Sequence, residues 1–333
     1  MTLSPKSEYA IELQELTRQF GDFIAVNHLS FRVRRGSIFG YLGSNGSGKS
    51  TSIRMLCGLL EPSSGTALIN GHDIVQDPEA VKRSIGYMNQ AFSLYRDLTV
   101  SENLDFFGGI YGLRGAALRD RKAEVIDLVG ISRFANRRSG QLSGGWKQRL
   151  ALATALIHEP EIIFLDEPTA GIDPVARRDL WDLLFTLAAS GKTLFVTTHY
   201  MDEAERCDDL SYIHDGKLIV QGTPTDLKLL PQVSPPGTRR VAIATPHPAQ
   251  ALAALKVQAF SLDATLVESE IHLLIPNSTE ESAIATVLTN SGLPAPRFRS
   301  IEPSLEDVFV TLTRSLLKEE VMNKEWGQAS VPA

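Results

Sequence analysis

Short strand-like segments alternate with longer helix-like segments over the first 230 residues of the chain. Runs of alternating or continuous apolar residues predict strands at Ala10–Leu16, Leu29–Val33, Ser37–Leu42, Thr66–Ile74, Ile85–Asn89, Ile162–Asp166 and Thr193–Thr198. Apolar residues at helical spacing predict helices over Thr51–Leu60, over Pro174–Ala189 and, interrupted by loops, from Thr99 to His158. Asp215-Gly216, between two apolar runs, predicts a β hairpin. Strands that alternate with helices favour an α/β fold with a parallel sheet.

The pattern changes after a proline-rich segment at residues 231–238, which we interpret as a linker. Beyond it we expect a strand, a helix, two strands, a helix, a strand and a helix, at Arg240–Thr245, Pro248–Val257, Ala264–Ile275, Glu280–Leu288, Arg297–Ile301 and Ser304–Leu317. This order is typical of a small α+β, ferredoxin-like split βαβ domain. Ser278 with Glu281, and Ser304 with Asp307, have the spacing of capping boxes at the last two helices. We expect residues 239–317 to form this accessory domain and residues 318–333 to form a flexible tail.

Composition limits the function classes. A chain of 333 residues is long enough for about two domains. Its net charge of −6 gives no electrostatic reason to expect nucleic acid as a partner. The sequence lacks a continuous apolar stretch of bilayer length, and its first residues lack the apolar centre of a signal peptide. Cys57 and Cys207 have no metal-binding spacing, so we expect a reducing, cytoplasmic location.

A glycine-rich segment lies between the predicted strand 37–42 and the helix after it, and it fits the pattern G-x-x-x-x-G-K-[ST]. The segment comprises Gly43, Ser44, Asn45, Gly46, Ser47, Gly48, Lys49 and Ser50. Glycines let backbone N–H groups approach phosphates closely, and the next helix directs its free N–H groups at the same oxygens. We therefore expect Lys49 to reach the β and γ phosphates of a nucleotide and the Ser50 hydroxyl to hold Mg²⁺.

Two adjacent acids close the predicted strand 162–166. Asp166 stands at the end of the strand, where it would hold Mg²⁺ directly or through water. Glu167 points elsewhere and can orient or deprotonate an attacking water. A third segment, Leu142–Trp146, precedes a helical run. There Ser143 can serve as the helix N-cap, and the same geometry also makes an anion site.

Taken together, these segments resemble the ABC-type ATPases. The resemblance is carried, in the order found in that family, by the glycine-rich loop, Gln90, Leu142–Trp146, Asp166-Glu167, Gly171-Ile172-Asp173 and Thr198-His199. It covers about residues 9–230. It implies a P-loop ATPase domain with a RecA-like core, an antiparallel β subdomain and a helical subdomain at about residues 92–158.

The resemblance also implies how ATP and Mg²⁺ would be bound. In that family two ATPase domains face each other head to tail with ATP between them. Lys49, Ser50 and Thr51 of one copy would bind the phosphates and Mg²⁺. Phe20 would stack on the adenine, with Phe23 as the alternative.

The remaining roles come from the same resemblance. The opposite copy would contact the γ phosphate with Ser143, Gly144 and Gly145, and Asp173 would link the two sites. Gln90 would sense Mg²⁺ and the attacking water at the hinge of the helical subdomain. His199 would polarise the γ phosphate or hold Glu167 and the water in position.

Within the family, Leu142–Arg149 and Thr197–Glu205 resemble the ATPase subunits of bacterial type-two export systems of the multidrug-resistance kind, and Pro303–Phe309 resembles the end of their accessory domain. This implies a separate transmembrane permease, a second ATPase subunit in a homodimer, and a location at the cytoplasmic face of the inner membrane. The alternative is a non-transport ABC ATPase that acts on ribosomes or DNA. Three positions depart from the family pattern, since Ser44 and Asn89 stand where proline is common and Trp146 where glutamine is frequent.

Overall fold

The chain forms two compact units, residues 1–223 and 224–333. The computed structural model describes residues 7–89 and 94–328, with side chains described up to residue 316. The division falls before residue 230, where the sequence places the end of the first domain. The reason is that α8 (Pro224–Lys228) packs against α11 (Leu305–Gln328) and buries Leu227 in the second unit.

A six-stranded sheet forms the centre of the first unit. Its strands, in spatial order, are β11 (Lys217–Gly222), β10 (Asp209–His214), β4 (Ile38–Gly43), β9 (Thr193–Thr198), β8 (Ile162–Asp166) and β7 (Ile85–Met88). All neighbours are parallel except β10 and β11, which form the predicted hairpin; Asp215 and Gly216 at its turn have φ of 45° and 75°. Because β4, β9 and β8 are parallel neighbours, their carboxyl ends meet at one edge of the sheet.

A second, antiparallel sheet contains β2 (Phe23–Leu29), β1 (Tyr9–Phe20), β5 (Ser64–Ile69) and β6 (His72–Asp73), with β3 (Arg32–Arg34) paired to β1. The predicted strand 29–33 is wrong, because β2 and β3 pair with different parts of β1. The chain turns between them, where the Ser30 hydroxyl donates to Glu15 Oε1 and accepts the Glu15 N–H. The predicted strand 66–74 is likewise two strands, joined at Asn70-Gly71, both of which have positive φ.

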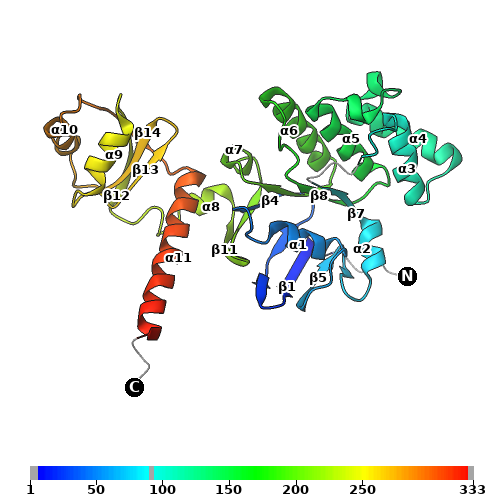
Figure 1. Cartoon of the computed structure of the whole chain (residues 1–333), viewed down its shortest axis with the longest axis horizontal. Coiled ribbons are helices and arrows are strands. Elements are labelled where there is room, and N and C mark those ends of the chain that lie inside the picture. Colours follow the sequence, from blue (N-terminus) through cyan, green and yellow to red (C-terminus); the bar gives the residue numbers. More distant parts are fainter. Residues whose placement is uncertain (1–6, 90–93, 329–333) are drawn as a thin grey trace. The chain divides into compact units, whose positions relative to one another are not determined.

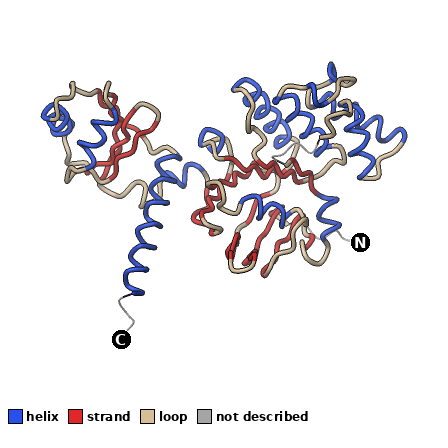
Figure 2. The backbone as a smooth tube through the Cα atoms, in the orientation of Figure 1, coloured by secondary structure: helices blue, strands red, loops and turns tan. Residues whose placement is uncertain are grey.

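The helices cover both faces of the central sheet. On one side lie α3 (Val100–Ile110), α4 (Gly115–Leu128), α5 (Gly144–Leu156) and α6 (Pro174–Ala189), and α1 (Lys49–Leu56) lies on the other side with the antiparallel sheet (Figure 1 and Figure 2). Short 3₁₀ turns at Ser132–Phe134 and Ser139–Gln141 connect α4 to α5, as expected of a helical region with loops. The predicted helix 51–60 is shifted, since α1 begins at Lys49 and ends before Gly58, whose φ is 65°.

Two short helices of the first unit are absent from the sequence prediction, α2 (Pro78–Ser84) and α7 (Met201–Ala204). For α2 the signal is present in the sequence. Asp77 caps the helix through the Ala80 N–H, and Pro78 occupies its first position, a combination typical of a helix start.

After the unpredicted helix α8, the second unit has the predicted element order. Its elements are β12 (Thr238–Ala244), α9 (Pro248–Lys256), β13 (Asp263–Val267), β14 (Glu270–Pro276), α10 (Glu281–Asn290), β15 (Arg297–Ile301) and α11. The strands lie in the order β13-β14-β12-β15, and all are antiparallel to their neighbours. Residues of α9 and α10, such as Leu255 and Leu288, share one apolar core with the sheet.

The ends of the helices in this unit differ from two predictions. The capping box at Ser304 and Asp307 is confirmed, because each side chain accepts the other's backbone N–H. The one at Ser278 is wrong, because Ser278 lies in the turn closed by the Thr279 N–H and the Pro276 carbonyl, and α10 is capped at Glu280. The backbone of α11 also continues to Gln328, past residue 317, since this stretch is rich in helix-forming Lys, Glu and Met.

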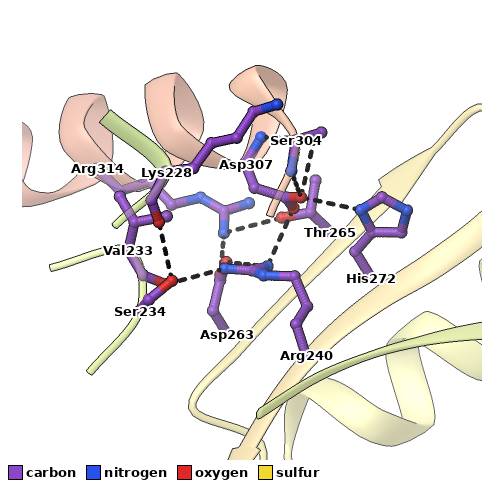
Figure 3. A network of polar contacts seen from close by, with 10 residues as sticks. All are labelled: Lys228, Val233, Ser234, Arg240, Asp263, Thr265, His272, Ser304, Asp307 and Arg314. Carbon is purple, nitrogen blue, oxygen red and sulfur yellow. Dashed lines mark hydrogen bonds and ion pairs between the residues drawn. The ribbon is translucent and has the colours of Figure 1, made fainter. Parts of the chain in front are cut away.

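A buried network of charged groups joins α11 to the sheet of the second unit (Figure 3). Arg240, from β12, donates to Asp307 Oδ1 at 3.0 Å, and His272 Nδ1 lies 3.0 Å from Asp307 Oδ2. Arg314 pairs with Asp263 at 2.6 Å. Burial by itself would raise the pKa of Asp307, but the hydrogen bond with His272, the charge of Arg240 and the Ser304 N–H together lower that pKa below its ordinary value. Among the described residues, no helix combines the length and the apolar character needed to cross a bilayer.

Candidate nucleotide site

The glycine-rich loop connects β4 to α1, as the sequence predicts. Gly46 and Gly48 have φ of 82° and 100°, values that only glycine adopts without strain. A Cβ on Gly43 would collide with the Ser47 side chain and the Ile213 carbonyl. The loop is also held from outside, because the Gly216 N–H donates to the Ser47 carbonyl at 3.0 Å. The backbone therefore curls tightly at the N-terminus of α1.

Lys49 lies within this curl. Its Nζ donates to the carbonyls of Gly43 and Ser44, at 2.7 and 3.0 Å. Burial lowers the pKa of Lys49, while the nearby charges of Glu167 and Asp166 raise it. The ammonium group thus stands between the loop and the two acids.

Asp166 is buried at the end of β8, which β9 separates from β4. Its Oδ1 accepts a hydrogen bond of 2.8 Å from the Thr197 hydroxyl of β9. Burial raises the pKa of Asp166, and hydrogen bonds from Thr197 and Ser50 act in the opposite direction. The contact with Ser50 brings the two predicted Mg²⁺ ligands together.

Thr197 is a site residue that the sequence analysis missed. Its hydroxyl oxygen also accepts the Glu167 N–H at 2.8 Å, so one side chain holds both acids. No signal in the sequence singles it out, since Thr193 and Thr198 of the same strand also carry hydroxyls. Thr197 lies beside Asp166 because of the parallel register between β8 and β9, which the sequence does not reveal.

Glu167 has a φ of 50°, an unfavourable conformation for a residue with a side chain. Its Oε1 lies 3.6 Å from Nδ1 of His199, and the imidazole lies tilted against the Tyr200 ring with ring centres 4.1 Å apart. Glu167 is largely buried, with 12% of its side chain exposed, whereas 44% of the His199 side chain is exposed. The structure therefore brings the predicted acid and histidine together.

The glycine-rich loop, Lys49 and Glu167 line a cleft of about 520 Å³, whereas Asp166, Thr197 and His199 are not among its lining residues. Its lining consists of Phe23, Ala25, Asn45, Gly46, Gly48, Lys49, Ser50, Thr51 and Glu167. Phe23 lines the cleft with 64% of its surface exposed, whereas Phe20 does not line it and instead carries the Arg18 guanidinium 4.5 Å above its ring. Ser44 is exposed on the loop and Ser47 is buried, with its N–H donating to the Ser44 carbonyl at 3.2 Å.

The predicted second half of the site lies elsewhere on the same unit. Ser143 is the N-cap of α5, and its hydroxyl makes no capping hydrogen bond. A Cβ on Gly145 would lie 2.7 Å from Ala176 Cβ, and one on Gly144 would lie 3.3 Å from the Gly171 carbonyl. Asp173 caps α6 by accepting from the N–H groups two and three residues ahead, both at 3.0 Å. The glycines therefore let the start of α5 pack against the start of α6, and none of these residues lines the cleft.

Two further positions from the sequence analysis need comment. Trp146, where the family often has glutamine, packs edge-on against Phe134 with ring centres 4.9 Å apart and lies under the Arg133 guanidinium. Gln90 lies outside the described residues.

Comparison with known proteins agrees with this geometry. Residues 26–170 match the family model for ABC transporters. The chain is 51% identical over 221 residues to the probable multidrug ABC transporter ATP-binding protein YbhF of Escherichia coli (strain K12), a match that covers 66% of this chain and 38% of that protein. It is 36% identical over 304 residues to the Nod factor export ATP-binding protein I of Burkholderia orbicola (strain AU 1054), with 91% of this chain and 96% of that protein covered.

The solved structures that resemble the chain include a dimeric ATP-binding cassette in a post-hydrolysis state with ADP and phosphate. It has a TM-score of 0.59 and 30% sequence identity, and the match covers 64% of this chain and 98% of that one.

Proposed function

Since the chain belongs to the family of ABC transporter ATP-binding proteins, we propose that it binds and hydrolyses ATP to power export through a separate membrane permease. The observation that carries this proposal is the single cleft in which the glycine-rich loop, Lys49 and Glu167 meet. The phosphates would lie on the loop, where backbone N–H groups and the N-terminus of α1 converge. Lys49 would exchange its two bonds to loop carbonyls for bonds to the β and γ phosphates.

Mg²⁺ fits the oxygen donors present. Ser50 and Asp166 supply a hydroxyl and a carboxylate in contact with each other. The described residues hold no group of three or more His, Cys, Asp or Glu side chains suited to a metal, so phosphate oxygens and water would complete the set, as is usual for Mg²⁺. When bound, the cation neutralises charge on the transferring phosphoryl group.

Glu167 is the candidate general base. A water would attack the γ phosphorus in line with the leaving ADP oxygen, and its proton would pass to a Glu167 carboxylate oxygen. His199, 3.6 Å from that carboxylate, would hold Glu167 and the water in place. The products are ADP and phosphate.

We place the adenine against Phe23 rather than Phe20. Both rings are exposed, but only Phe23 lines the cleft, and Phe20 is already covered on one face by Arg18. A free aromatic face stabilises a stacked base.

A second copy of the chain would complete the site. Ser143 has a free hydroxyl at a helix N-terminus, which suits the γ phosphate, but it does not line the cleft of its own copy. Two copies placed head to tail would bring Ser143, Gly144 and Gly145 of one onto the ATP of the other, with Asp173 between the two sites.

The permease would dock at a groove of about 410 Å³ between α2, β7 and α3. Leu59, Ile110 and Tyr111 line the groove and are exposed, as expected of a surface that another apolar chain covers. This would place the ATPase at the cytoplasmic face of the membrane, with residues 239–317 as a stabilising or dimer-supporting domain.

Glu167→Gln tests the chemistry. The variant should bind ATP but hydrolyse it about 10²–10⁴-fold more slowly, because the amide cannot accept the proton. It should also accumulate an ATP-bound dimer, detectable by size-exclusion chromatography with light scattering. Hydrolysis at the wild-type rate would show that Glu167 is not the base.

Purification from membranes tests the biological role. Recovery of the chain with a membrane permease supports export. Recovery with ribosomes or DNA instead would refute export while leaving the ATPase activity intact.

A further inference from the structure

A fully buried carboxylate stands four residues after His199. Glu203, in α7, accepts a 2.7 Å hydrogen bond from the hydroxyl of Thr198, the last residue of β9. Its other oxygen lies 3.5 Å from Nε of Arg177, in the first turn of α6. Buried carboxylates are stable only when they are paired. The contact is an ion pair without a hydrogen bond, and through it Arg177 links the segment that carries His199 to α6.

Arg177 also begins a stack that ends at the candidate base. Its guanidinium carbon lies 4.1 Å from the centre of the Tyr200 ring, and Tyr200 lies 4.1 Å from His199 with the ring planes at 36°. His199 Nδ1 is the atom that faces Glu167. The Tyr200 N–H donates to the Thr198 hydroxyl at 3.0 Å. The segment from Thr198 to Tyr200 is therefore held through its backbone as well as through the contacts of Tyr200 with Arg177 and His199.

We propose that Arg177 is a positioning residue that orients His199 toward Glu167 through Tyr200 and Glu203. This inference rests on the proposed ATPase activity. An imidazole that is 44% exposed has few contacts to hold its ring plane, and Tyr200 supplies the contact on one face. Arg177 holds Tyr200 by its charge over the ring and holds the segment by its pair with Glu203.

The position of Arg177 gives this role a wider consequence. The preceding residue, Ala176, packs against Gly145, in the turn that would meet the ATP of the second copy. The first turn of α6 thus contacts Gly145, which would face the ATP of the second copy. Through Arg177, the same turn also holds His199, which faces Glu167 of its own copy. A shift of α6 upon dimer formation would reach His199 through this contact.

The test compares steady-state hydrolysis in full-length variants. Tyr200→Ala removes the stack, and Tyr200→Phe keeps it. Arg177→Gln combined with Glu203→Gln removes both charges without leaving a buried carboxylate unpaired. Arg178→Ala changes the neighbouring exposed arginine as a matched control.

We expect Tyr200→Ala and the paired glutamine variant to lower kcat about 10- to 100-fold, because a small misplacement of a catalytic group has effects of this size. The KM for ATP should stay within about threefold, since neither change touches the loop that binds the phosphates. Tyr200→Phe and Arg178→Ala should retain the wild-type kcat. Wild-type kcat in the paired glutamine variant would overturn the proposal.

A double-mutant cycle separates positioning from a general structural effect. In a His199→Ala background, measured by single-turnover hydrolysis, Tyr200→Ala and the paired glutamine variant should cause no further loss. A further loss of the same factor would show that Arg177 does not act through His199, and the inference would fail. If instead the wild-type protein does not hydrolyse ATP, the proposed function itself fails.

Discussion

Replacing Thr197 by valine removes one hydroxyl from β9 and nearly preserves the shape of the side chain. In the wild-type protein that hydroxyl donates to the buried Asp166 carboxylate and accepts the Glu167 N–H, both at 2.8 Å. The substitution therefore removes a charge-assisted hydrogen bond and leaves a backbone N–H without its acceptor.

The expected cost follows from these two bonds. A hydrogen bond to a charged group contributes about 1.5–3 kcal/mol, and a buried N–H without an acceptor costs about 1–3 kcal/mol. Because Ser50 still contacts Asp166 and the two effects share one site, we expect a loss of about 2–4 kcal/mol in the free energy of unfolding. The pKa of Asp166 should rise further, because the Thr197 hydrogen bond lowers it. We expect kcat to fall about 10- to 100-fold, since Glu167 also loses its backbone anchor.

Thr193→Val is the matched control. Thr193 lies at the opposite end of β9, and its hydroxyl accepts only a neutral backbone N–H, that of Gly36, at 2.9 Å. It should cost about 1–2 kcal/mol of stability and leave kcat unchanged. Urea unfolding and steady-state ATP hydrolysis measure both quantities. If Thr197→Val hydrolysed ATP as fast as Thr193→Val, Thr197 would not be supporting the acids, and the assignment would be refuted.

Three further changes test separate parts of the molecule. Phe23→Ala should weaken ATP binding about 5- to 100-fold, the loss of one stacked base, whereas Phe20→Ala should change it less than twofold; calorimetric titration decides, and the reverse order would return the adenine to Phe20. Asp307→Asn should destabilise the second unit by about 3–5 kcal/mol at pH 7, because it breaks a buried charge network. The pKa of the Asp307 carboxyl is lowered in the folded state, so this stabilisation is present above the unfolded-state pKa of about 4 and is lost as pH falls through the folded-state pKa. A stability difference between wild type and Asp307→Asn that stayed constant with pH would contradict the assignment. As a control, Glu270→Gln, in an exposed pair, should cost under about 1 kcal/mol. Gln90→Ala should lower transport more than ATP binding in reconstituted vesicles, and unaltered transport would remove its coupling role.

The parts of the fold predicted well are those in which local and long-range preferences agree. The strand 162–166 and the helix 174–189 match the structure to the residue, because each combines a clear apolar period with an end signal. Asp173-Pro174 is such a signal, a side chain that caps the helix followed by a proline suited to its first position. The glycine-rich loop was predictable for the same reason, since close backbone approach demands glycine wherever it occurs.

The failures occur where sheet pairing overrides the local pattern. Residues 29–33 alternate like one strand, but β2 and β3 pair with β1 at different registers, and the chain must turn between them. Thr197 escaped attention for a related reason. Its role depends on which strand lies beside β8, and the order of strands in a sheet cannot be read from the local sequence. The choice between Phe20 and Phe23 also depended on pairing, because the turn between β1 and β2 decides which ring faces the loop.

The charges in the cleft explain why nucleotide should order this site. Burial raises the pKa of Asp166, so its ionised form increasingly opposes folding as pH rises from the unfolded-state pKa to the folded-state pKa. The Lys49 ammonium group donates to two loop carbonyls, which are neutral acceptors and do not balance its charge. Mg²⁺ and a triphosphate would give the carboxylate a counter-charge and the ammonium an anion at the same moment. Binding of the nucleotide should therefore also stabilise the folded state. A ligand at 100 times its Kd should add about 2.7 kcal/mol to the free energy of unfolding. Because Ser143 does not line this cleft, that gain arises within one copy, and any further gain that depends on protein concentration would report the second copy.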